Sequence, residues 1–401
     1  FIISITLTII LGKDDKTCIF SVPNKLGILL FFVIGLGFLI TGIALGNITY
    51  LVFCIVFVFI FPALYAVIQT KKELQVVLES LAKGVTYAFA AVIFSSFVFA
   101  PVTAAQYSSV LGNPNALGDY AVAALASSIY MLFMLNNSRK KKYFYYFIII
   151  MSLVLSFLSR SRTTVLSVIP IILMWIIAEI YFHKSEQDKV KNLAKKILVL
   201  AILTVFFAYA SIYIGSSITP KIVELLGLSD SLNYFNMENN NDLDMQEATE
   251  LFMDRADQGI SKGGRFTSGR VDIWKYYIER IGFLGHQNET IYPTSNGGFL
   301  NAHNAYIQLS YSAGIVSGIG LIILSVFLVV RAIKMIINEV KEKRWTPELL
   351  FAVMISAGFA LRVMVSALYT PFNYALTVAF WVVISTFMVK NHYSMRKRYE
   401  R

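Results

Sequence analysis

Residues 26–45 read LGILLFFVIGLGFLITGIAL and include no charged side chain. A run of about 20 apolar residues lets a helix cross the bilayer hydrocarbon while it satisfies its own backbone hydrogen bonds. Similar runs follow near 50–69, 85–104, 117–136, 143–159, 163–182, 197–217, 303–330, 347–368 and 370–389. The sequence therefore predicts an all-α, polytopic transmembrane helical bundle of about 10–12 spans.

The composition supports a membrane protein. Hydrophobic residues make up 57% of the 401 positions, charged residues make up 15%, and the mean hydropathy is +0.64. A soluble domain of this length could not hide so much apolar surface from water. The stretch 1–11 is too short to span the bilayer. We expect it to end a span that begins upstream, because it lacks the basic start and cleavage site of a signal peptide.

The net charge of +11 comes from Lys and Arg that cluster in alternate loops. The intervening short loops 46–49, 105–115 and 369–373 contain neither residue. This is the positive-inside pattern, so the basic charge indicates topology rather than nucleic-acid binding. It predicts a cytoplasmic C-terminus. The predicted division is N-terminal transmembrane helices in 1–216, a large extracytoplasmic loop in 217–302, C-terminal transmembrane helices in 303–389, and a basic cytoplasmic tail in 390–401.

Two arginines in a short outer turn depart from this pattern. The turn 159–162 reads SRSR and places Arg160 and Arg162 between two spans. A guanidinium group offers a planar fork of donors to phosphate oxygens, so the pair is a candidate anion clamp. Contact with lipid phosphates or with loop carboxylates explains it equally well.

The second part of the large loop is also basic. Arg265 and Arg270 lie in the stretch GGRFTSGR at 263–270, which leads into 271–281, where apolar residues recur at helical spacing. We expect an amphipathic helix near the membrane surface there, with Ser268 as its N-cap. A cation in the first helical turn is unfavourable unless an anion shares the site. The alternative is a salt bridge to a nearby carboxylate.

The sequence NAHNAYIQLSY at 301–311 begins a span with polar residues. At helical spacing its side chains form two neighbouring stripes, Asn304 with Gln308 and Tyr311, and His303 with Tyr306 and Ser310. Such stripes usually face a bundle interior or a wet cavity. With Asn301 as N-cap, His303 would lie in the first turn, where the helix dipole favours a neutral imidazole that can accept a proton. A purely structural histidine is the alternative.

Three other features remain open. Arg362 lies within a span, and it either extends to the surface or faces a cavity. The turn GNPN at 112–115 offers the amide of Asn115 to sugar hydroxyls, or it is a plain turn. Asp242 and Asp244 form a D-x-D pair in an acidic loop, which is weak support for a metal site. The histidines show no spacing that suits zinc.

Taken together, these pieces resemble the O-antigen ligase and O-antigen polymerase family of bacterial membrane glycosyltransferases. The similarity rests on their order along the chain, which is GNPN at 112–115, SRT at 161–163, SGR at 268–270 with Trp274, and AHN at 302–304 followed by Leu309 and Gly314. No single piece is specific. The ordered set, with each member on the predicted outer side, carries the resemblance.

The resemblance implies a GT-C-like fold in the bacterial inner (cytoplasmic) membrane, with an extracytoplasmic active site. It implies an undecaprenyl diphosphate-linked oligosaccharide donor, a glycan or glycolipid acceptor, and an inverting reaction without a metal or other cofactor. His303 would be the general base, and Arg162 and Arg270 would neutralise the leaving diphosphate, with Arg160 and Arg265 as helpers. The other expected substrate contacts are Asn304, Tyr306, Asn115 and Arg362.

The acceptor distinguishes two activities in cell-envelope polysaccharide biosynthesis. Another lipid-linked chain would make the protein a polymerase, and a lipid A core would make it a ligase. A glycolipid transporter or flippase without transferase activity is the alternative from another class, and it would need polar residues through several spans. A metal-dependent transferase would place carboxylates in the loop 46–49, which has none.

Overall fold

The computed structural model describes residues 24–68, 70–102, 107–135, 139–182, 189–227, 270–293, 298–342, 345–372 and 374–388. In these residues eight helices are long and apolar enough to cross a membrane, Lys25–Leu45, Ile48–Val67, Lys71–Phe99, Pro114–Met134, Arg139–Leu158, Arg162–Tyr181, Lys191–Leu225 and Ile315–Lys341. The chain is therefore an all-α, multi-pass membrane protein. Residues 1–11, for which we expect an upstream span, lie outside the described part.

The chain divides into two compact units. Unit 1 comprises Phe1–Ser80, Gly269–Asn373 and Thr377–Arg401, and unit 2 comprises Leu81–Ser268 and Tyr374–Leu376. One boundary falls inside α5 (Lys71–Phe99) and another inside α17 (Ala375–Val383). This division follows compactness, whereas the division made from the sequence follows membrane sidedness, so the latter stays a prediction.

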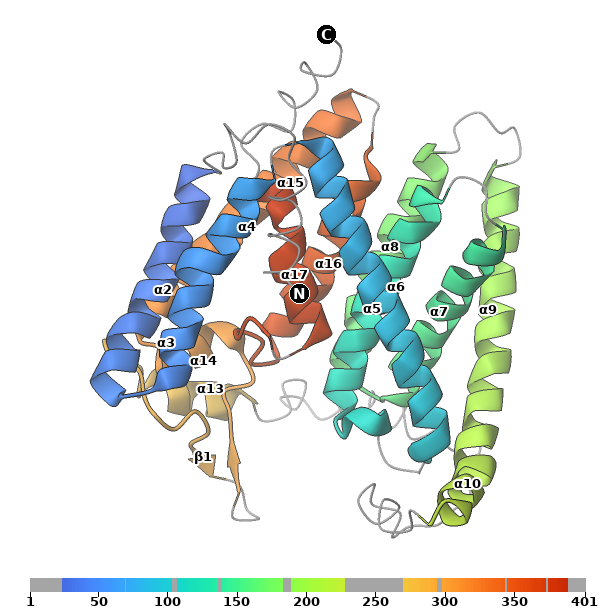
Figure 1. The fold of residues 1–401 in the computed structure, drawn as a ribbon, viewed down its shortest axis with the longest axis horizontal. Coiled ribbons are helices and arrows are strands. Elements are labelled where there is room, and N and C mark those ends of the chain that lie inside the picture. Colours follow the sequence, from blue (N-terminus) through green and yellow to red (C-terminus); the bar gives the residue numbers. More distant parts are fainter. Residues whose placement is uncertain are drawn as a thin grey trace. The chain divides into compact units, whose positions relative to one another are not determined.

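Unit 1 is built from helices near both ends of the described chain (Figure 1). Its first elements are α2 (Lys25–Leu45), α3 (Ile48–Ile55), the π-helical turn η2 (Val56–Ile60) and α4 (Phe61–Val67). The later ones are α13 (Arg270–Ile278), β1 (Tyr292–Pro293), β2 (Phe299–Leu300), α14 (Ala305–Ser312), α15 (Ile315–Lys341), α16 (Pro347–Val363), α17 and α18 (Ser385–Met388).

An aromatic cluster joins these early and late elements of unit 1. The ring of Trp381 in α17 lies 5.7 Å from that of Phe31 in α2 and 5.2 Å from that of Phe57 in η2. The Tyr65 hydroxyl in α4 donates a hydrogen bond to the carbonyl of Trp381 at 2.7 Å. Aromatic rings bury large areas and prefer such edge-on contacts, so this cluster is the core that holds the two ends together.

The predicted span 303–330 is wrong in one respect, because it is two helices. α14 ends at Ser312 and α15 begins at Ile315. Gly314 between them has a φ of 86°, and a Cβ there would collide with the carbonyl of Phe283. The Ile315 amide donates to the carbonyl of Gly282 at 3.0 Å. The segment after α13 thus crosses the chain at Gly314 and interrupts the helix.

Unit 2 contains the rest of α5, the short turn η3 (Ser109–Leu111), α6 (Pro114–Met134), α7 (Arg139–Leu158), α8 (Arg162–Phe182), α9 (Lys189–Tyr213), η4 (Ile214–Ile218) and α10 (Thr219–Leu225). α6 is its most buried span and is rich in alanine and serine. Small residues allow helix backbones to approach closely in membranes. At Gly118, for example, a Cβ would collide with the Thr164 side chain of α8.

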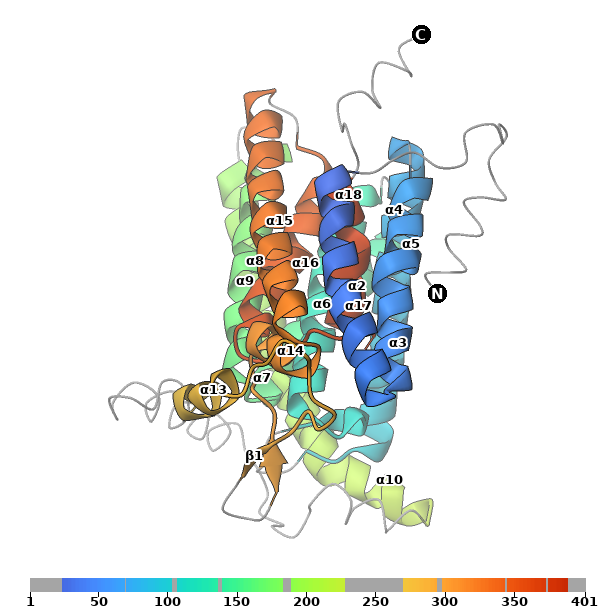
Figure 2. The ribbon, with the colours of Figure 1, turned by 90° about the vertical axis from the view of Figure 1, so that its left-hand side faces the viewer.

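One end of unit 1 carries the elements that the sequence singles out. α13, α14 and the two-stranded sheet gather beyond the same ends of α2, α3 and α15 in both views (Figures 1 and 2). The helix predicted over 271–281 is confirmed and spans Arg270–Ile278. β1 and β2 pair antiparallel, with Tyr292 opposite Leu300. The sequence did not predict this small sheet.

Candidate functional site

α13 is fixed to unit 1 by a small apolar cluster. Ile273 and Tyr277 of α13 are buried together with Ala302 and Tyr311. The Tyr277 hydroxyl lies 2.8 Å from the carbonyl oxygens of both Glu289 and Leu300, and it accepts a hydrogen bond from the Ile291 amide at 3.0 Å. Burial raises the pKa of Tyr277 to about 12, so the hydroxyl stays protonated and can donate. This packing places the start of α13 near His303.

His303 occupies a tight bend immediately before α14. Its φ is 48°, in the left-handed region that residues other than glycine rarely adopt. Its amide donates to Asn301 Oδ1 at 2.9 Å, and the preceding amide, that of Ala302, donates to Gln308 Oε1 at 2.7 Å. A non-glycine residue in this conformation stores strain and is a mark of functional sites.

The helix cap differs from the prediction. Asn304, not Asn301, is the N-cap of α14, and its Oδ1 accepts hydrogen bonds from the amides of Tyr306 and Ile307 at 3.0 and 3.2 Å. His303 therefore lies before the helix rather than in its first turn. The helix dipole is not what keeps its imidazole neutral.

Burial and a neighbouring cation lower the pKa of the His303 imidazole instead. Partial burial of the imidazole, and then the positive charge of Arg270, lower the pKa of His303 below its ordinary value of 6.5. The charge of Arg270, the first residue of α13, thus acts on the imidazole of His303. Two of the predicted site residues are thus brought together within unit 1, and the imidazole is neutral at pH 7 and able to accept a proton.

The other polar residues of α14 have structural partners. Besides capping the helix, Asn304 donates from Nδ2 to the carbonyl of Met364 at 3.2 Å, which joins the end of α16 to the start of α14. Asn304 is only 5% exposed. These bonds give Asn304 a role in positioning the loop, and its expected contact with substrate stays a prediction.

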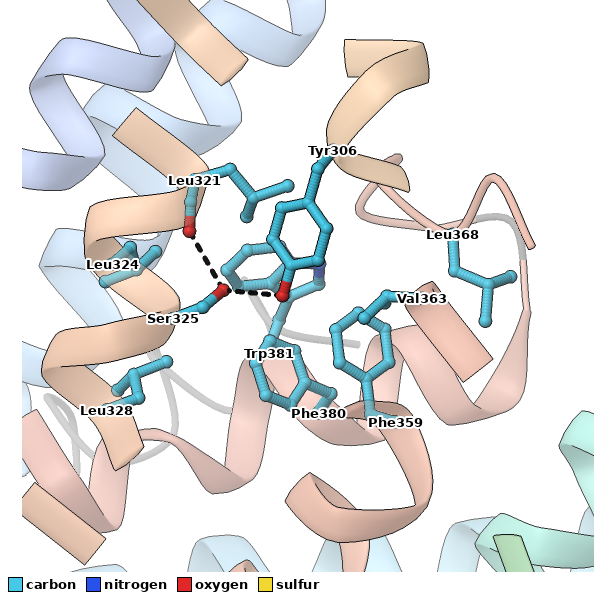
Figure 3. Close-up of a pocket in the computed structure, with 10 residues that line it drawn as sticks. All are labelled: Tyr306, Leu321, Leu324, Ser325, Leu328, Phe359, Val363, Leu368, Phe380 and Trp381. Carbon is cyan, nitrogen blue, oxygen red and sulfur yellow. Dashed lines mark hydrogen bonds between the residues drawn. The ribbon is translucent and has the colours of Figure 1, made fainter. Parts of the chain in front are cut away.

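Tyr306 points into a mainly apolar cavity (Figure 3). Its hydroxyl lies 3.1 Å from Oγ of Ser325 on α15, and that Oγ donates in turn to the Leu321 carbonyl. Phe359, Phe380 and Trp381 are among the residues that line the cavity. The cavity holds about 10 Å³, which is room for roughly one water molecule.

Arg362 is fully buried in α16, with a relative exposure of 0%. The possibility that its side chain extends to the surface is therefore excluded. The Arg362 carbonyl accepts a hydrogen bond from the Val365 amide at the end of α16. This is close to Met364, whose carbonyl accepts the hydrogen bond from Asn304. A buried guanidinium in a membrane helix is costly and is usually kept for a function.

Unit 2 brings two other predicted motifs together. Ser161 donates from Oγ to Asn115 Oδ1 at 3.1 Å and lies 3.1 Å from Thr163 Oγ1. The turn 159–162 thereby touches the turn at 112–115, so α6 and α8 begin side by side. Helix N-termini carry partial positive charge and free amides.

The arginines of this turn add formal charge to the two helix ends. Arg162 is the first residue of α8. Arg160 has a φ of 49° and is only 6% exposed. Helix N-termini that begin side by side suit an anion such as a phosphate, and both arginines belong to the turn that precedes one of them. Asn115 uses its side-chain oxygen to hold Ser161, so its expected contact with sugar hydroxyls stays a prediction.

The remaining predicted residues are not described. Arg265, Ser268, Asp242 and Asp244 all lie outside the described part of the chain. Among the residues that are described, no group of three or more His, Cys, Asp and Glu is placed to hold a metal ion. Metal independence stays a prediction.

The sequence reasoning missed Glu289. Its carboxylate accepts a hydrogen bond from the hydroxyl of Tyr50 in α3 at 3.2 Å, and its carbonyl accepts from Tyr277 and Gln308 at 2.8 Å each. Glu289 is thus a junction between α3, α13 and α14. It belongs to no periodic stripe or motif, so only the three-dimensional contacts reveal it.

Comparison with known proteins adds no family assignment. Neither a family model, nor a curated protein, nor a solved structure matches the chain.

Proposed function

We propose that this chain is a membrane glycosyltransferase that moves an undecaprenyl diphosphate-linked glycan to an acceptor hydroxyl on the outer face of the bacterial inner membrane. The activity is that of an O-antigen or capsule-type polysaccharide polymerase, or of an O-antigen ligase. One observation carries the proposal, which is a partly buried His303 in a strained left-handed bend, where burial and the charge of Arg270 lower the pKa of its imidazole.

This pair suits an inverting displacement. His303 accepts the proton of the acceptor hydroxyl while the hydroxyl oxygen attacks the anomeric carbon. The bond from that carbon to the diphosphate oxygen breaks on the opposite side, which inverts the configuration. The diphosphate leaves with the electron pair, and Arg270 stabilises its developing charge where other transferases use a metal ion. In unit 2 the Arg160–Arg162 turn is a second cationic group suited to phosphate.

Reconstitution tests the proposal directly. The purified protein in vesicles would receive a lipid diphosphate-linked oligosaccharide, either alone or with a lipid A core acceptor, and mass spectrometry would identify the product. Longer lipid-linked chains indicate a polymerase, and a glycosylated lipid A core indicates a ligase. A chelator is expected to leave the rate unchanged, whereas a loss restored by Mg²⁺ or Mn²⁺ would contradict metal independence.

The buried Arg362 favours a glycolipid transporter as the second candidate, because ionisable groups inside membrane helices also mark transport pathways. Glu348 of the same helix is 2% exposed, so α16 carries a buried charged residue near each of its ends. A transporter would move the labelled glycolipid across the vesicle bilayer without forming a new glycosidic bond. That result in the same vesicles would replace the transferase proposal.

A further inference from the structure

Both polar atoms of the Gln308 side chain make hydrogen bonds close to His303. Gln308 is 1% exposed. Its Oε1 accepts from the amide of Ala302 at 2.7 Å, and its Nε2 donates to the carbonyl of Glu289 at 2.8 Å and to Oγ of Ser312 at 3.0 Å. One side chain thus ties α14 to the segment before His303 and to the segment that follows α13.

Only a primary amide of this length meets these demands. The Ala302 amide requires an acceptor and the Glu289 carbonyl requires a donor, and glutamine supplies both from one planar group. An ionised glutamate has acceptors but no donor, and methionine of similar length has no donor and only a weak acceptor. Leaving a buried amide or carbonyl unpaired costs about 1–3 kcal/mol, so these contacts are specific to the residue at 308.

The bond to Ala302 is placed where it controls His303. It fixes the peptide immediately before a residue with a φ of 48°. A left-handed conformation persists in a non-glycine residue only where the surroundings impose it. The Asn301 side chain is a local restraint on the same bend, whereas Gln308 attaches the bend to a helix and to Glu289.

The Glu289 carbonyl also connects Gln308 to the helix that Arg270 begins. The Glu289 carbonyl that receives Gln308 lies 2.8 Å from the hydroxyl of Tyr277, and Tyr277 lies in α13, which Arg270 begins. The position of the imidazole relative to the guanidinium therefore depends on the contacts at Glu289.

We propose that Gln308 is a positioning residue whose amide holds the Ala302 peptide against Glu289 and so fixes the imidazole of His303 beside Arg270. The catalytic consequence rests on the proposed function, whereas the placement of the imidazole does not. Gln308 does not itself touch the reacting atoms.

The test is the substitution Gln308→Met, which keeps length and removes every hydrogen bond of the amide. NMR of protein labelled at histidine ¹³Cε1 would follow the imidazole titrations, with the His303 signal assigned by its loss in His303→Gln. We expect the His303 midpoint to rise toward 6.5, because the loosened ring becomes more hydrated and moves from Arg270. The kcat for glycan transfer should fall by about 10- to 100-fold, with KM little changed.

Ser310→Ala is the matched control. It removes one side-chain hydrogen bond from the same helix, the 2.8 Å bond to the Tyr306 carbonyl, without touching the His303 loop. Its His303 midpoint and kcat should equal those of the unsubstituted protein. If Gln308→Met does not fold, the shorter amide in Gln308→Asn, which cannot reach both partners, gives the same comparison.

An unchanged His303 midpoint in a folded Gln308 variant overturns the positioning role. This outcome is separate from failure of the proposed function, which would appear as full glycan transfer by His303→Ala. The titration decides the role of Gln308 even if the protein transfers no glycan.

Discussion

The bends at His303 in unit 1 and Arg160 in unit 2 have the same backbone conformation but different surroundings. Each residue has a φ near 50°, 48° for His303 and 49° for Arg160, and each lies two positions before the first residue of a helix. A left-handed L-residue costs roughly 1–2 kcal/mol, so each unit stores strain where the sequence predicts a functional cation or base.

Each of the two bends has partners next to it and partners far away along the chain. The Ser159 and Ser161 side chains flank Arg160, with Asn115 from the neighbouring turn. The His303 bend depends on Gln308 and on Asn304, which joins Met364, 60 residues away. Both bends therefore use tertiary contacts, because the Ser161–Asn115 bond spans 46 positions and the Asn304–Met364 bond spans 60. The histidine bend is attached at a second point, through Gln308 to Glu289. This comparison predicts that His303 is the more sensitive to distant substitutions.

The largest expected effect is the loss of the imidazole. His303→Ala should lower glycan transfer by about 10²- to 10⁴-fold, since proton transfer by a placed base contributes that much. The rate in reconstituted vesicles measures it, with insertion checked by protease protection. Retained transfer would remove His303 from the reaction and leave its strained bend without a catalytic purpose.

The substitutions of Arg162 and Arg270 should have the next largest effects on the rate of transfer. Replacing Arg162 or Arg270 with glutamine should lower kcat by about 10²-fold if each stabilises developing charge on the diphosphate. Lys140→Gln, at the opposite end of α7 from the arginine turn, is the control for a lost surface cation. A loss confined to Arg270→Gln would show that the arginine turn of unit 2 has no part in transfer.

The pH dependence separates these two variants further. Because Arg270 lowers the pKa of His303, the neutral base persists to lower pH than an ordinary histidine would allow. Removing the charge in Arg270→Gln should raise that pKa and move the acid limb of the rate profile to higher pH. Arg162→Gln is expected to lower the whole profile without moving the limb. An unmoved limb in Arg270→Gln would contradict the electrostatic contact as a catalytic feature.

Much of the fold follows from hydropathy alone, because the bilayer requires long apolar helices that close their own hydrogen bonds. The break at Gly314 does not follow from it. The residues on either side are as helical in pattern as any span, and only the crossing of Phe283 requires a glycine there. A contact between segments 31 residues apart leaves no periodic signal in the chain.

The site was predictable to a similar extent. The polar stripe at 303–311 identified His303 and Gln308, since polar residues in a span are costly and therefore informative. The cap at Asn304 could not be separated from one at Asn301, because both asparagines suit that position. Glu289 and Tyr50 lie 239 positions apart, and their contact depends on the packing of unit 1.

A smaller effect follows from the strain in the two bends. Glycine adopts a φ near 50° without a steric cost, so His303→Gly should be more stable than His303→Ala by about 1 kcal/mol although both lack the base. Thermal unfolding in detergent measures the difference. Equal stability of the two variants would show that the bend relaxes once the imidazole is gone, and that its left-handed backbone depends on the side chain.

The smallest effects compare single hydrogen bonds at the two bends. Asn304→Ala removes a helix cap and the contact to Met364, and it should cost about 1–2 kcal/mol of the free energy of unfolding. Ser161→Ala removes the 3.1 Å bond to Asn115, which joins two turns 46 positions apart, and should cost about 0.5–1 kcal/mol. Only the first variant should also raise the titration midpoint of His303, because only its bond supports the loop that carries the imidazole. A larger loss of stability in Ser161→Ala than in Asn304→Ala would reverse the comparison and make the arginine turn the more dependent on its contacts.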